Sequence, residues 1–243
     1  MNHLERALDQ QNQWWKYIVI ILVGFVAANF IGALPLIVII TTRTLQGYTA
    51  NPENVLDLSA YGIDLNIGLI LMLLPFVVGL LIIIPLLKNL HKRSLSEVIN
   101  GTKKIRWNRF FFSMGIWTLL MIASFAIEYL AFPQDFVLQF DPVKFSILLI
   151  ISIVLIPFQT TFEEVIFRGY LMQGFAAWTK NRWLAIIIPA IAFGLMHSFN
   201  PEIDSYGFWL AMPQYILFGL IFGIMVVLDD GIETSMGAHA ANN

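Results

Sequence analysis

Cysteine is absent from this chain of 243 residues. Disulfide bonds, thiol catalysis and zinc–thiolate sites are therefore excluded. Charge is scarce as well, because Asp, Glu, Lys and Arg together make up 12% of the residues, about half of the usual quarter. Basic and acidic residues nearly balance, at 14 against 16. The chain thus has no strongly basic composition of the kind that indicates binding to nucleic acid.

Apolar residues take the place of the missing charge. They make up 58% of the chain, against about 45–50% in soluble proteins. One soluble domain cannot bury that much apolar surface in a single core, and disordered chains have the opposite composition. The sequence therefore predicts an all-α, polytopic transmembrane helical bundle with six to seven spans, and we expect it in the cell (plasma) membrane.

Long segments without charge mark the candidate spans, since a helix that crosses a bilayer needs about 20 mostly apolar residues. Six segments qualify: Tyr17–Thr42, Leu65–Leu87, Phe110–Phe132 with Glu128 inside it, Phe145–Phe162, Trp183–Phe199 and Tyr206–Leu228. A seventh begins near Ile232 and reaches Asn243 before it is long enough to span. We expect this last helix to be cut short or only partly inserted.

Lysine and arginine are concentrated in one predicted loop. Half of them lie between Lys88 and Arg109. Cytoplasmic loops of membrane proteins are enriched in these two residues. The Lys88–Arg109 loop is therefore predicted to be cytoplasmic, and counting spans from it places the N-terminus and the segment Lys180–Arg182 on the same side.

Ionisable side chains inside predicted spans are costly in lipid and usually functional. The fourth span ends at such a group, formed by Glu163, Glu164 and Arg168. On a helix, Glu164 and Arg168 are four residues apart and share a face, which predicts an ion pair. Glu163 points about 100° away and is a candidate general base. A helix-stabilising pair at the cytoplasmic boundary, with Glu163 reaching the interface, fits the same residues. Glu128 is interpreted as an interfacial carboxylate.

Histidine appears at helical spacing in two further places. Phe193 and His197 share a face near the end of the fifth span, where a hydrogen-bonded or interfacial histidine is the plain alternative. His239 and Asn243 share a face at the end of the chain, among small residues that permit close helix packing in lipid. A polar tail is the alternative there. His3 and His91 lie in polar stretches, and we assign neither of them a role.

Taken together and in this order, the three motifs resemble the CPBP family of membrane proteins. That family includes the type II CAAX prenyl endopeptidases and bacterial abortive-infection and bacteriocin-processing relatives. The matching residues are Glu163-Glu164-x-x-x-Arg168, Phe193-x-x-x-His197 and His239-x-x-x-Asn243. The resemblance makes residues 143–243 the catalytic core, which we expect to be cut short at the C-terminus. The spans in residues 1–142 match in hydropathy only.

The resemblance implies an intramembrane endopeptidase that uses a glutamate-activated water and no cofactor. Glu163 would be the general base, and His197 would position or activate the water. An oxyanion hole would come from His239 and Asn243. The supporting residues would be Glu164, Arg168 and Phe193. The implied partners are the lipid bilayer and a membrane-anchored peptide or protein substrate, prenylated CAAX-type substrates included.

This mechanism makes a geometric prediction. Glu163 and His197 should lie within about 5 Å of each other, because a base and its partner must reach the same water. His239 and Asn243 are expected farther away if the end of the chain is frayed.

Three other functions fit parts of the pattern. Glu163, His197 and His239 could bind zinc in a metallopeptidase, although the H-E-x-x-H spacing is missing. A non-catalytic membrane scaffold or immunity-type protein needs no active site at all. A proton-relaying transporter is disfavoured, because no chain of acidic residues runs across several spans.

Overall fold

The computed structural model describes residues 2–8, 11–51 and 57–243. In this part of the chain the regular structure is helical throughout and contains no strand, which confirms the predicted all-α fold. The helices are, in order, α1 (Asn2–Glu5), η1 (Arg6–Leu8), α2 (Trp14–Ala27), η2 (Ala28–Gly32), α3 (Leu34–Leu45), η3 (Leu58–Tyr61), α4 (Leu65–Leu86), η4 (Leu87–His91), α5 (Leu95–Asn100), α6 (Trp107–Ala131), η5 (Pro133–Asp135), α7 (Pro142–Glu164), η6 (Val165–Leu171), α8 (Met172–Thr179), α9 (Arg182–Met196), α10 (Pro201–Tyr206), α11 (Phe208–Asp229) and α12 (Glu233–Asn242).

Five helical stretches in the described residues are long and apolar enough to cross a membrane. They are Trp14–Leu45, Leu65–His91, Trp107–Ala131, Pro142–Thr179 and Phe208–Asp229. Helix α9 is apolar too but shorter, and it corresponds to the fifth expected span. The start of the expected seventh span is α12. The predicted polytopic bundle is thus confirmed, with five long spans and α9 in place of the six to seven expected.

Large apolar side chains cover the outside of the bundle. Leu130 on α6 is 79% exposed, and Leu228 on α11 is 81% exposed. In water such side chains would favour aggregation. In a bilayer they face lipid tails, which are as apolar as they are. This surface fits an integral membrane protein.

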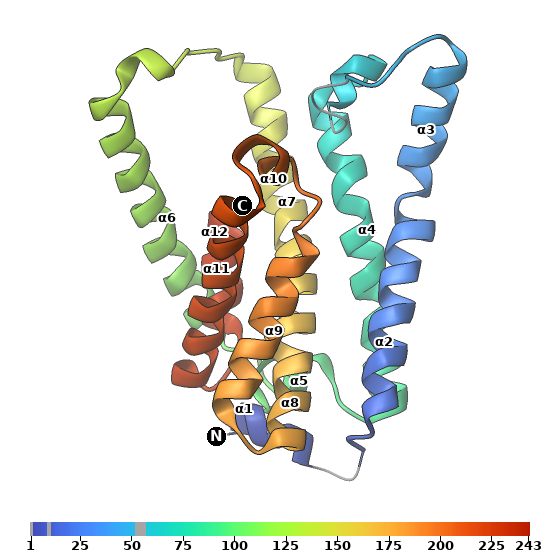
Figure 1. The fold of residues 1–243 in the computed structure, drawn as a ribbon, viewed down its shortest axis with the longest axis vertical. Coiled ribbons are helices and arrows are strands. Elements are labelled where there is room, and N and C mark those ends of the chain that lie inside the picture. Colours follow the sequence, from blue (N-terminus) through green and yellow to red (C-terminus); the bar gives the residue numbers. More distant parts are fainter. Residues whose placement is uncertain (1, 9–10, 52–56) are drawn as a thin grey trace.

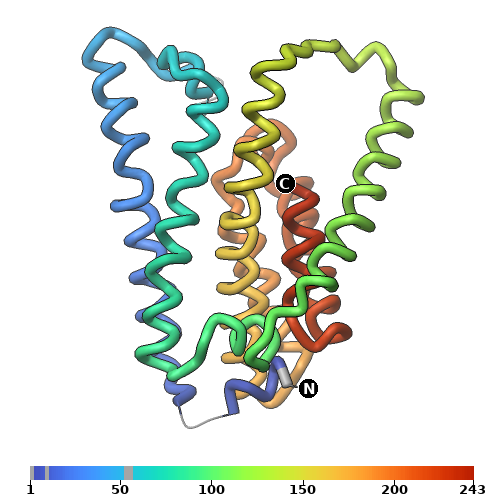
Figure 2. Tube along the Cα trace, turned by 180° about the vertical axis from the view of Figure 1, so that it is seen from behind, coloured from blue at the N-terminus to red at the C-terminus, as the bar shows by residue number. Residues whose placement is uncertain are grey.

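The helices pack in a clear order. Figure 1 and the view from behind in Figure 2 show α6 on one flank and α2, α3 and α4 on the other, with α7 and α12 between them. Helix α6 packs on α12, α12 on α7, α7 on α4, and α9 on α11. The N-terminus, α1, α5 and α8 lie together at one end of the bundle (Figure 1). We call this the basic end, because the lysines and arginines gather there.

The helix that carries Glu163 and Glu164 continues past them, and this determines how deep the two glutamates lie in the bundle. Helices α7, η6 and α8 form one unbroken stretch, Pro142–Thr179. Glu163 therefore lies within this stretch, about 24 Å from Thr179 at 1.5 Å per residue. Along α9, His197 lies about 22 Å from Arg182 by the same rise. Because α8 and α9 are joined by a tight turn, the two side chains reach similar depth, although Glu163 looked like a boundary residue in sequence.

Gly237 allows the last helix, α12, to pack closely against α6. A Cβ on Gly237 would collide with the backbone oxygen of Phe110 and with Ser113 Oγ. Ser113 Oγ also donates a 2.7 Å hydrogen bond to the Thr234 carbonyl. The missing side chain therefore lets α12 lie directly against α6. The close contact fixes the helix that carries His239 and Asn243.

Candidate active site

Glu164 and Arg168 form a buried ion pair. Arg168 Nη1 donates to Glu164 Oε1 at 2.8 Å, and the two side chains are 1% and 0% exposed. The pairing predicted from their spacing is therefore present, although the π-helical segment η6 begins directly after Glu164 and contains Arg168. Removing one partner of such a pair leaves an uncompensated buried charge, which costs about 3–5 kcal/mol.

His239 lies between the two glutamates. Its Nδ1 is 2.9 Å from Glu164 Oε1, and its Nε2 is 3.5 Å from Glu163 Oε2. The imidazole is almost fully buried, and the Glu163 side chain is 12% exposed. Helix α12 is formed up to Asn242, so the last helix is ordered in the structure. His239 is consequently close to the glutamate pair, not farther away as a frayed end would leave it.

Gln159 joins Glu163 to the end of α12. Its amide nitrogen donates to Glu163 Oε1 at 2.9 Å, and its amide oxygen accepts from Asn243 Nδ2 at 2.9 Å. Gln159 is one helical turn before Glu163, so both side chains lie on one face of α7. This bridge brings Asn243 to the same site as Glu163 and His239.

His197 has a defined orientation at the end of α9. Its Nδ1 lies 2.7 Å from the Phe193 carbonyl oxygen. A carbonyl only accepts hydrogen bonds, so Nδ1 carries the proton and Nε2 holds the lone pair in the neutral ring. The ring stacks on Tyr215, with centroids 4.4 Å apart. Asn200 Nδ2 donates to the Tyr215 hydroxyl at 3.1 Å, and this hydroxyl donates to Glu202 Oε2 at 3.2 Å.

Phe193 lies among the charged and imidazole groups. The Arg168 guanidinium is 4.0 Å from the centre of its ring. The rings of His197 and His239 are 4.5 Å and 6.0 Å away, centre to centre. A cation over an aromatic face is favourable and more so when desolvated. Phe193 thus packs between the ion pair and both histidines.

A cavity of about 590 Å³ opens beside these groups. Its walls come from the end of α9, α10, residues 210–222 of α11, the end of α12 and Gln159 of α7. The lining residues are Gln159, Phe193, His197, Asn200, Glu202, Tyr206, Leu210, Ala211, Gln214, Tyr215, Phe218, Phe222, His239, Asn242 and Asn243. His197, His239 and Asn243 therefore face one space.

The structure brings the predicted residues together to different degrees. Glu163, Glu164, Arg168 and His239 are in direct contact, and Asn243 is one side chain away. His197 shares the cavity wall with His239. Within the described residues no hydrogen bond or ion pair joins His197 to Glu163, and their 5 Å separation stays a prediction. No group of three His, Asp or Glu side chains in the described part of the chain is arranged to hold a metal ion.

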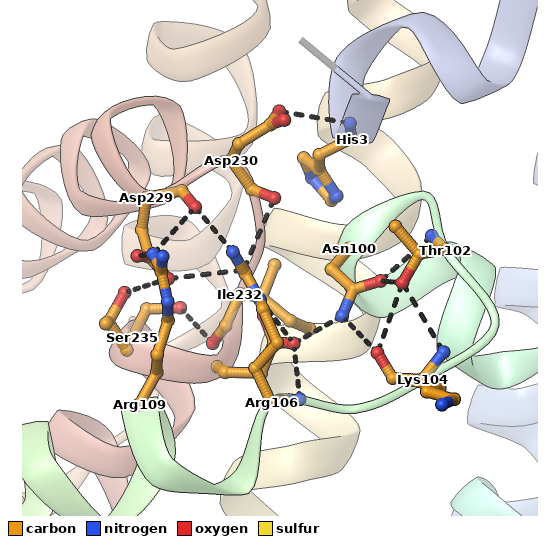
Figure 3. Close-up of polar contacts among 12 residues, drawn as sticks. His3, Asn100, Thr102, Lys104, Arg106, Arg109, Asp229, Asp230, Ile232 and Ser235 are labelled. Atoms are coloured by element: carbon orange, nitrogen blue, oxygen red, sulfur yellow. Dashed lines mark hydrogen bonds and ion pairs between the residues drawn. The ribbon is translucent and has the colours of Figure 1, made fainter.

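A second polar cluster anchors the start of α12 at the basic end (Figure 3). Arg106 binds Glu233 at 2.5 Å and Asp229 at 3.2 Å, and Asn100 also donates to Glu233. Burial by itself would raise the pKa of Glu233, but the hydrogen bonds from Arg106 and Asn100 outweigh it and hold the pKa below its usual value. Glu233 stays charged, and this clamp fixes the first turn of the helix that carries His239.

His3 reaches the back of the site from the N-terminal helix. Its Nε2 contacts the Arg168 carbonyl oxygen at 3.0 Å, and its backbone nitrogen donates to Asp230 at 3.1 Å. The side chain is 1% exposed. Burial lowers the pKa of His3 to about 4, against the opposing effect of its hydrogen bond to Arg168. His3 is therefore a buried neutral residue that contacts the Arg168 backbone, which its polar neighbours in the sequence did not indicate. His91 is buried too, with its Nε2 2.6 Å from the Tyr170 hydroxyl.

Sequence reasoning missed several residues of the site. Gln159 could have been found, because it lies four residues before Glu163 on the same helical face. Tyr215, Arg106 and His3 gave no such signal, since each reaches the site from a segment distant in sequence.

These features define the class of protein: a multi-pass helical membrane protein with a buried carboxylate–histidine site. Comparison with known proteins places it further. The family model described as type II CAAX prenyl endopeptidase Rce1-like matches residues 142–243. The chain belongs to this Rce1-like family, which implies a peptidase.

Among curated proteins, the uncharacterized protein YyaK of Bacillus subtilis (strain 168) is 31% identical over 245 aligned residues. The alignment covers 100% of this chain and 80% of that protein. No solved structure matches the chain.

Proposed function

We propose that the chain is an intramembrane endopeptidase that hydrolyses peptide bonds of membrane-associated substrates, prenylated CAAX-type substrates included, with a water activated by Glu163. The observation that carries the proposal is the position of His239 between Glu163 and Glu164. The proposed base, Glu163 of α7, and a hydrogen-bond donor, His239 of α12, are then directed at the same point in the site. Peptide hydrolysis needs both in that arrangement.

In the proposed reaction Glu163 removes a proton from water as the water oxygen attacks the peptide carbonyl carbon. The carbonyl oxygen becomes an oxyanion. When the tetrahedral intermediate collapses, the carbon–nitrogen bond breaks and the proton held by Glu163 passes to the leaving amine. Nε2 of His197, left free by the Phe193 hydrogen bond, accepts a hydrogen bond from the same water and orients it.

We assign the oxyanion hole to His239 and Asn243. Donation from His239 requires a proton on Nε2. Glu164 Oε1 lies 2.9 Å from Nδ1 and holds the ring with Nε2 toward Glu163. The Asn243 amide is held by Gln159 beside Glu163. Arg168 pairs with Glu164 at 2.8 Å, and this ion pair supports the carboxylate that His239 contacts.

The proposed site works without a metal or another cofactor. A zinc site would need Glu163, His197 and His239 as common ligands. His239 is instead engaged by both glutamates, and His197 Nδ1 by a backbone carbonyl. The Phe193 carbonyl leaves Nε2 of His197 free, so cleavage in the presence of a chelator decides between the glutamate mechanism and the zinc mechanism.

We further propose that the protein is in the cell membrane with its N-terminus and the Lys88–Arg109 loop in the cytoplasm. Support comes from the basic end of the bundle, where lysines and arginines from three separate segments meet. The partners proposed are the lipid bilayer and a peptide or protein substrate, and no nucleic acid.

The test compares cells that produce the wild-type chain, Glu163→Gln or Glu128→Gln. Glu128 is a second membrane carboxylate, on the exposed surface of α6, and so it is a matched control. Newly formed peptide N-termini are catalogued by mass spectrometry. We expect a set of termini that depends on the protein and disappears only with Glu163→Gln. Identical catalogues from all three, at equal protein abundance, would refute the peptidase and favour the membrane scaffold.

A further inference from the structure

His197 lies at the C-terminal end of α9, and its ring needs more than one contact to keep a fixed direction. Helix α9 ends at Met196, and His197 is the residue that caps it. One hydrogen bond orients the ring, from Nδ1 to the Phe193 carbonyl oxygen at 2.7 Å. A single hydrogen bond fixes one atom of the ring and still allows the ring to pivot about that atom. The direction of Nε2 therefore depends on what else the ring contacts.

Two aromatic rings contact the imidazole of His197. The Phe193 ring lies 4.5 Å from it with an angle of 50° between the planes, and the Tyr215 ring lies 4.4 Å from it with an angle of 23°. Tyr215 is thus the nearly parallel neighbour and covers one face of the imidazole. Stacked aromatic pairs are favourable beyond the area that they bury. A pivot of the imidazole would break this stack, so Tyr215 restricts the motion that the hydrogen bond leaves open.

Helix packing brings Tyr215 to His197 although the two residues belong to different helices. Helix α11 packs on α9, and Gly194 of α9 lies where they meet. A Cβ on Gly194 would collide with Ile216, the residue that follows Tyr215. The missing side chain therefore lets α11 approach α9 closely, three residues before His197. This close approach places the two rings in contact.

The hydroxyl end of Tyr215 is fixed as well. It accepts a hydrogen bond from Asn200 Nδ2 at 3.1 Å and donates one to Glu202 Oε2 at 3.2 Å. Asn200 is the N-cap residue of α10, yet its side chain makes no capping hydrogen bond with that helix. Its amide binds Tyr215 instead. The Tyr215 side chain is thus held at one end by α11 and at the other by the start of α10.

We propose that Tyr215 is a positioning residue, which holds the ring of His197 in one orientation so that Nε2 keeps a fixed direction in the cavity. The use of that direction to orient a water rests on the proposed peptidase function, whereas the order of the ring itself does not. The Tyr215 hydroxyl is engaged by Asn200 and Glu202. We therefore assign Tyr215 no direct part in the reaction.

The orientation of His197 can be measured without a substrate. Nuclear magnetic resonance of the full chain in lipid bilayers, with isotope-labelled histidine, reports which ring nitrogen carries the proton. The chain has four histidines, and His197→Gln identifies the signals of His197. In alkaline buffer we expect a single neutral ring with the proton on Nδ1. Tyr215→Leu and Tyr215→Met should lose this single form and show both protonated forms, whereas Tyr215→Phe, which keeps the ring, should retain it.

Phe218→Leu is the matched control. Phe218 lies on the same helix and lines the same cavity, but its ring contacts Trp117 and Phe222. This variant should keep the wild-type signals of His197. Wild-type signals in the folded Tyr215→Leu or Tyr215→Met variant would overturn the inference. Loss of the single form in Phe218→Leu as well would overturn it too, because the effect would then be general to the cavity wall.

Cleavage kinetics test the consequence for the proposed reaction. On a peptide whose cleavage depends on Glu163, Tyr215→Leu should lower kcat by about tenfold, since the loss of orientation affects the transition state more than substrate binding. KM should change little, and Tyr215→Phe should recover most of kcat. Equal kcat for Tyr215→Leu and the wild type would overturn the positioning role while the peptidase stands. If no cut depends on Glu163, the peptidase itself fails, and the resonance comparison alone decides whether Tyr215 orders His197.

Discussion

Gln159 holds Glu163 by a 2.9 Å hydrogen bond to the carboxylate oxygen that His239 does not contact. The bond leaves the other oxygen, Oε2, directed at His239. Because Gln159 also accepts from Asn243, one side chain orients the proposed base and one proposed oxyanion donor together. The relationship makes Gln159 a positioning residue of the site.

Replacing Gln159 by alanine should lower turnover by about tenfold or more, since a hydrogen bond to a charged group is worth about 1.5–3 kcal/mol. The loss should fall on kcat, with KM changed little, because orientation and not substrate contact is removed. Gln46→Ala, at an exposed site near Arg43, is the control. Equal kinetics for Gln159→Ala and the wild type would show that Glu163 does not need this bond.

The two neighbouring glutamates should respond differently to the same substitution. Glu164→Gln leaves Arg168 as a buried, unpaired cation and should reduce the free energy of unfolding by about 3–5 kcal/mol. Glu163→Gln keeps the hydrogen bond with Gln159 available and should abolish turnover at nearly unchanged stability. Thermal unfolding in detergent and cleavage assays separate the effects. A large stability loss in Glu163→Gln would make it a structural residue.

Much of the fold and site follows from local spacing. Apolar segments of spanning length predicted the bundle, and the i,i+4 rule predicted the Glu164–Arg168 pair. Both depend only on residues close in the chain. The depth of Glu163 was harder, because a charge inside an apolar run looks like the end of a span. The helix continues in the structure because His239 and Gln159 engage that charge from inside the bundle.

Contacts between distant segments could not be predicted in this way. His3 contacts the Arg168 carbonyl oxygen although the two residues are 165 positions apart in the sequence. Arg106, in a loop, contacts Glu233 in the same way. Nothing in the local pattern of either residue distinguishes a buried partner from an exposed polar one. Which helices pack against each other determines these contacts. Rules on the spacing of residues within one helix contain no information about that packing.

Activity should persist in the presence of a strong chelator. The proposed reaction uses the Glu163 carboxylate as base, and removal of divalent metal leaves that group unchanged. The measurement is cleavage by purified protein before and after treatment with EDTA, together with metal analysis of the same sample. Loss of activity that returns on addition of zinc would favour the metallopeptidase alternative.

Acid should destabilise the protein through His3 before the carboxylates titrate. Its pKa falls from 6.5 to about 4 on folding, so between these values the unfolded chain binds a proton that the native state does not. Stability must then fall as the pH drops from about 6.5 toward 4. At pH 5 the loss relative to pH 8 should be on the order of 2 kcal/mol. In His3→Gln, which has no titratable ring, this part of the pH profile should be flat. A wild-type profile that is equally flat above pH 5 would contradict burial of a neutral His3.

Substitution of Gly237 by alanine should damage both stability and activity. The added Cβ would meet the backbone of Phe110, which cannot rotate away as a side chain can. Helix α12 must then move from α6, at a cost of about 1–3 kcal/mol for overpacking. The shift also carries His239 away from Glu163, so turnover should fall further than the folded fraction does.

Gly115→Ala is the matched control, because a Cβ at Gly115 has open space around it and that substitution lies on the same helix, α6, as Phe110. Unfolding midpoints and cleavage rates of the two variants decide the matter. If Gly237→Ala keeps full activity per folded molecule, His239 does not depend on the close packing of α12 against α6.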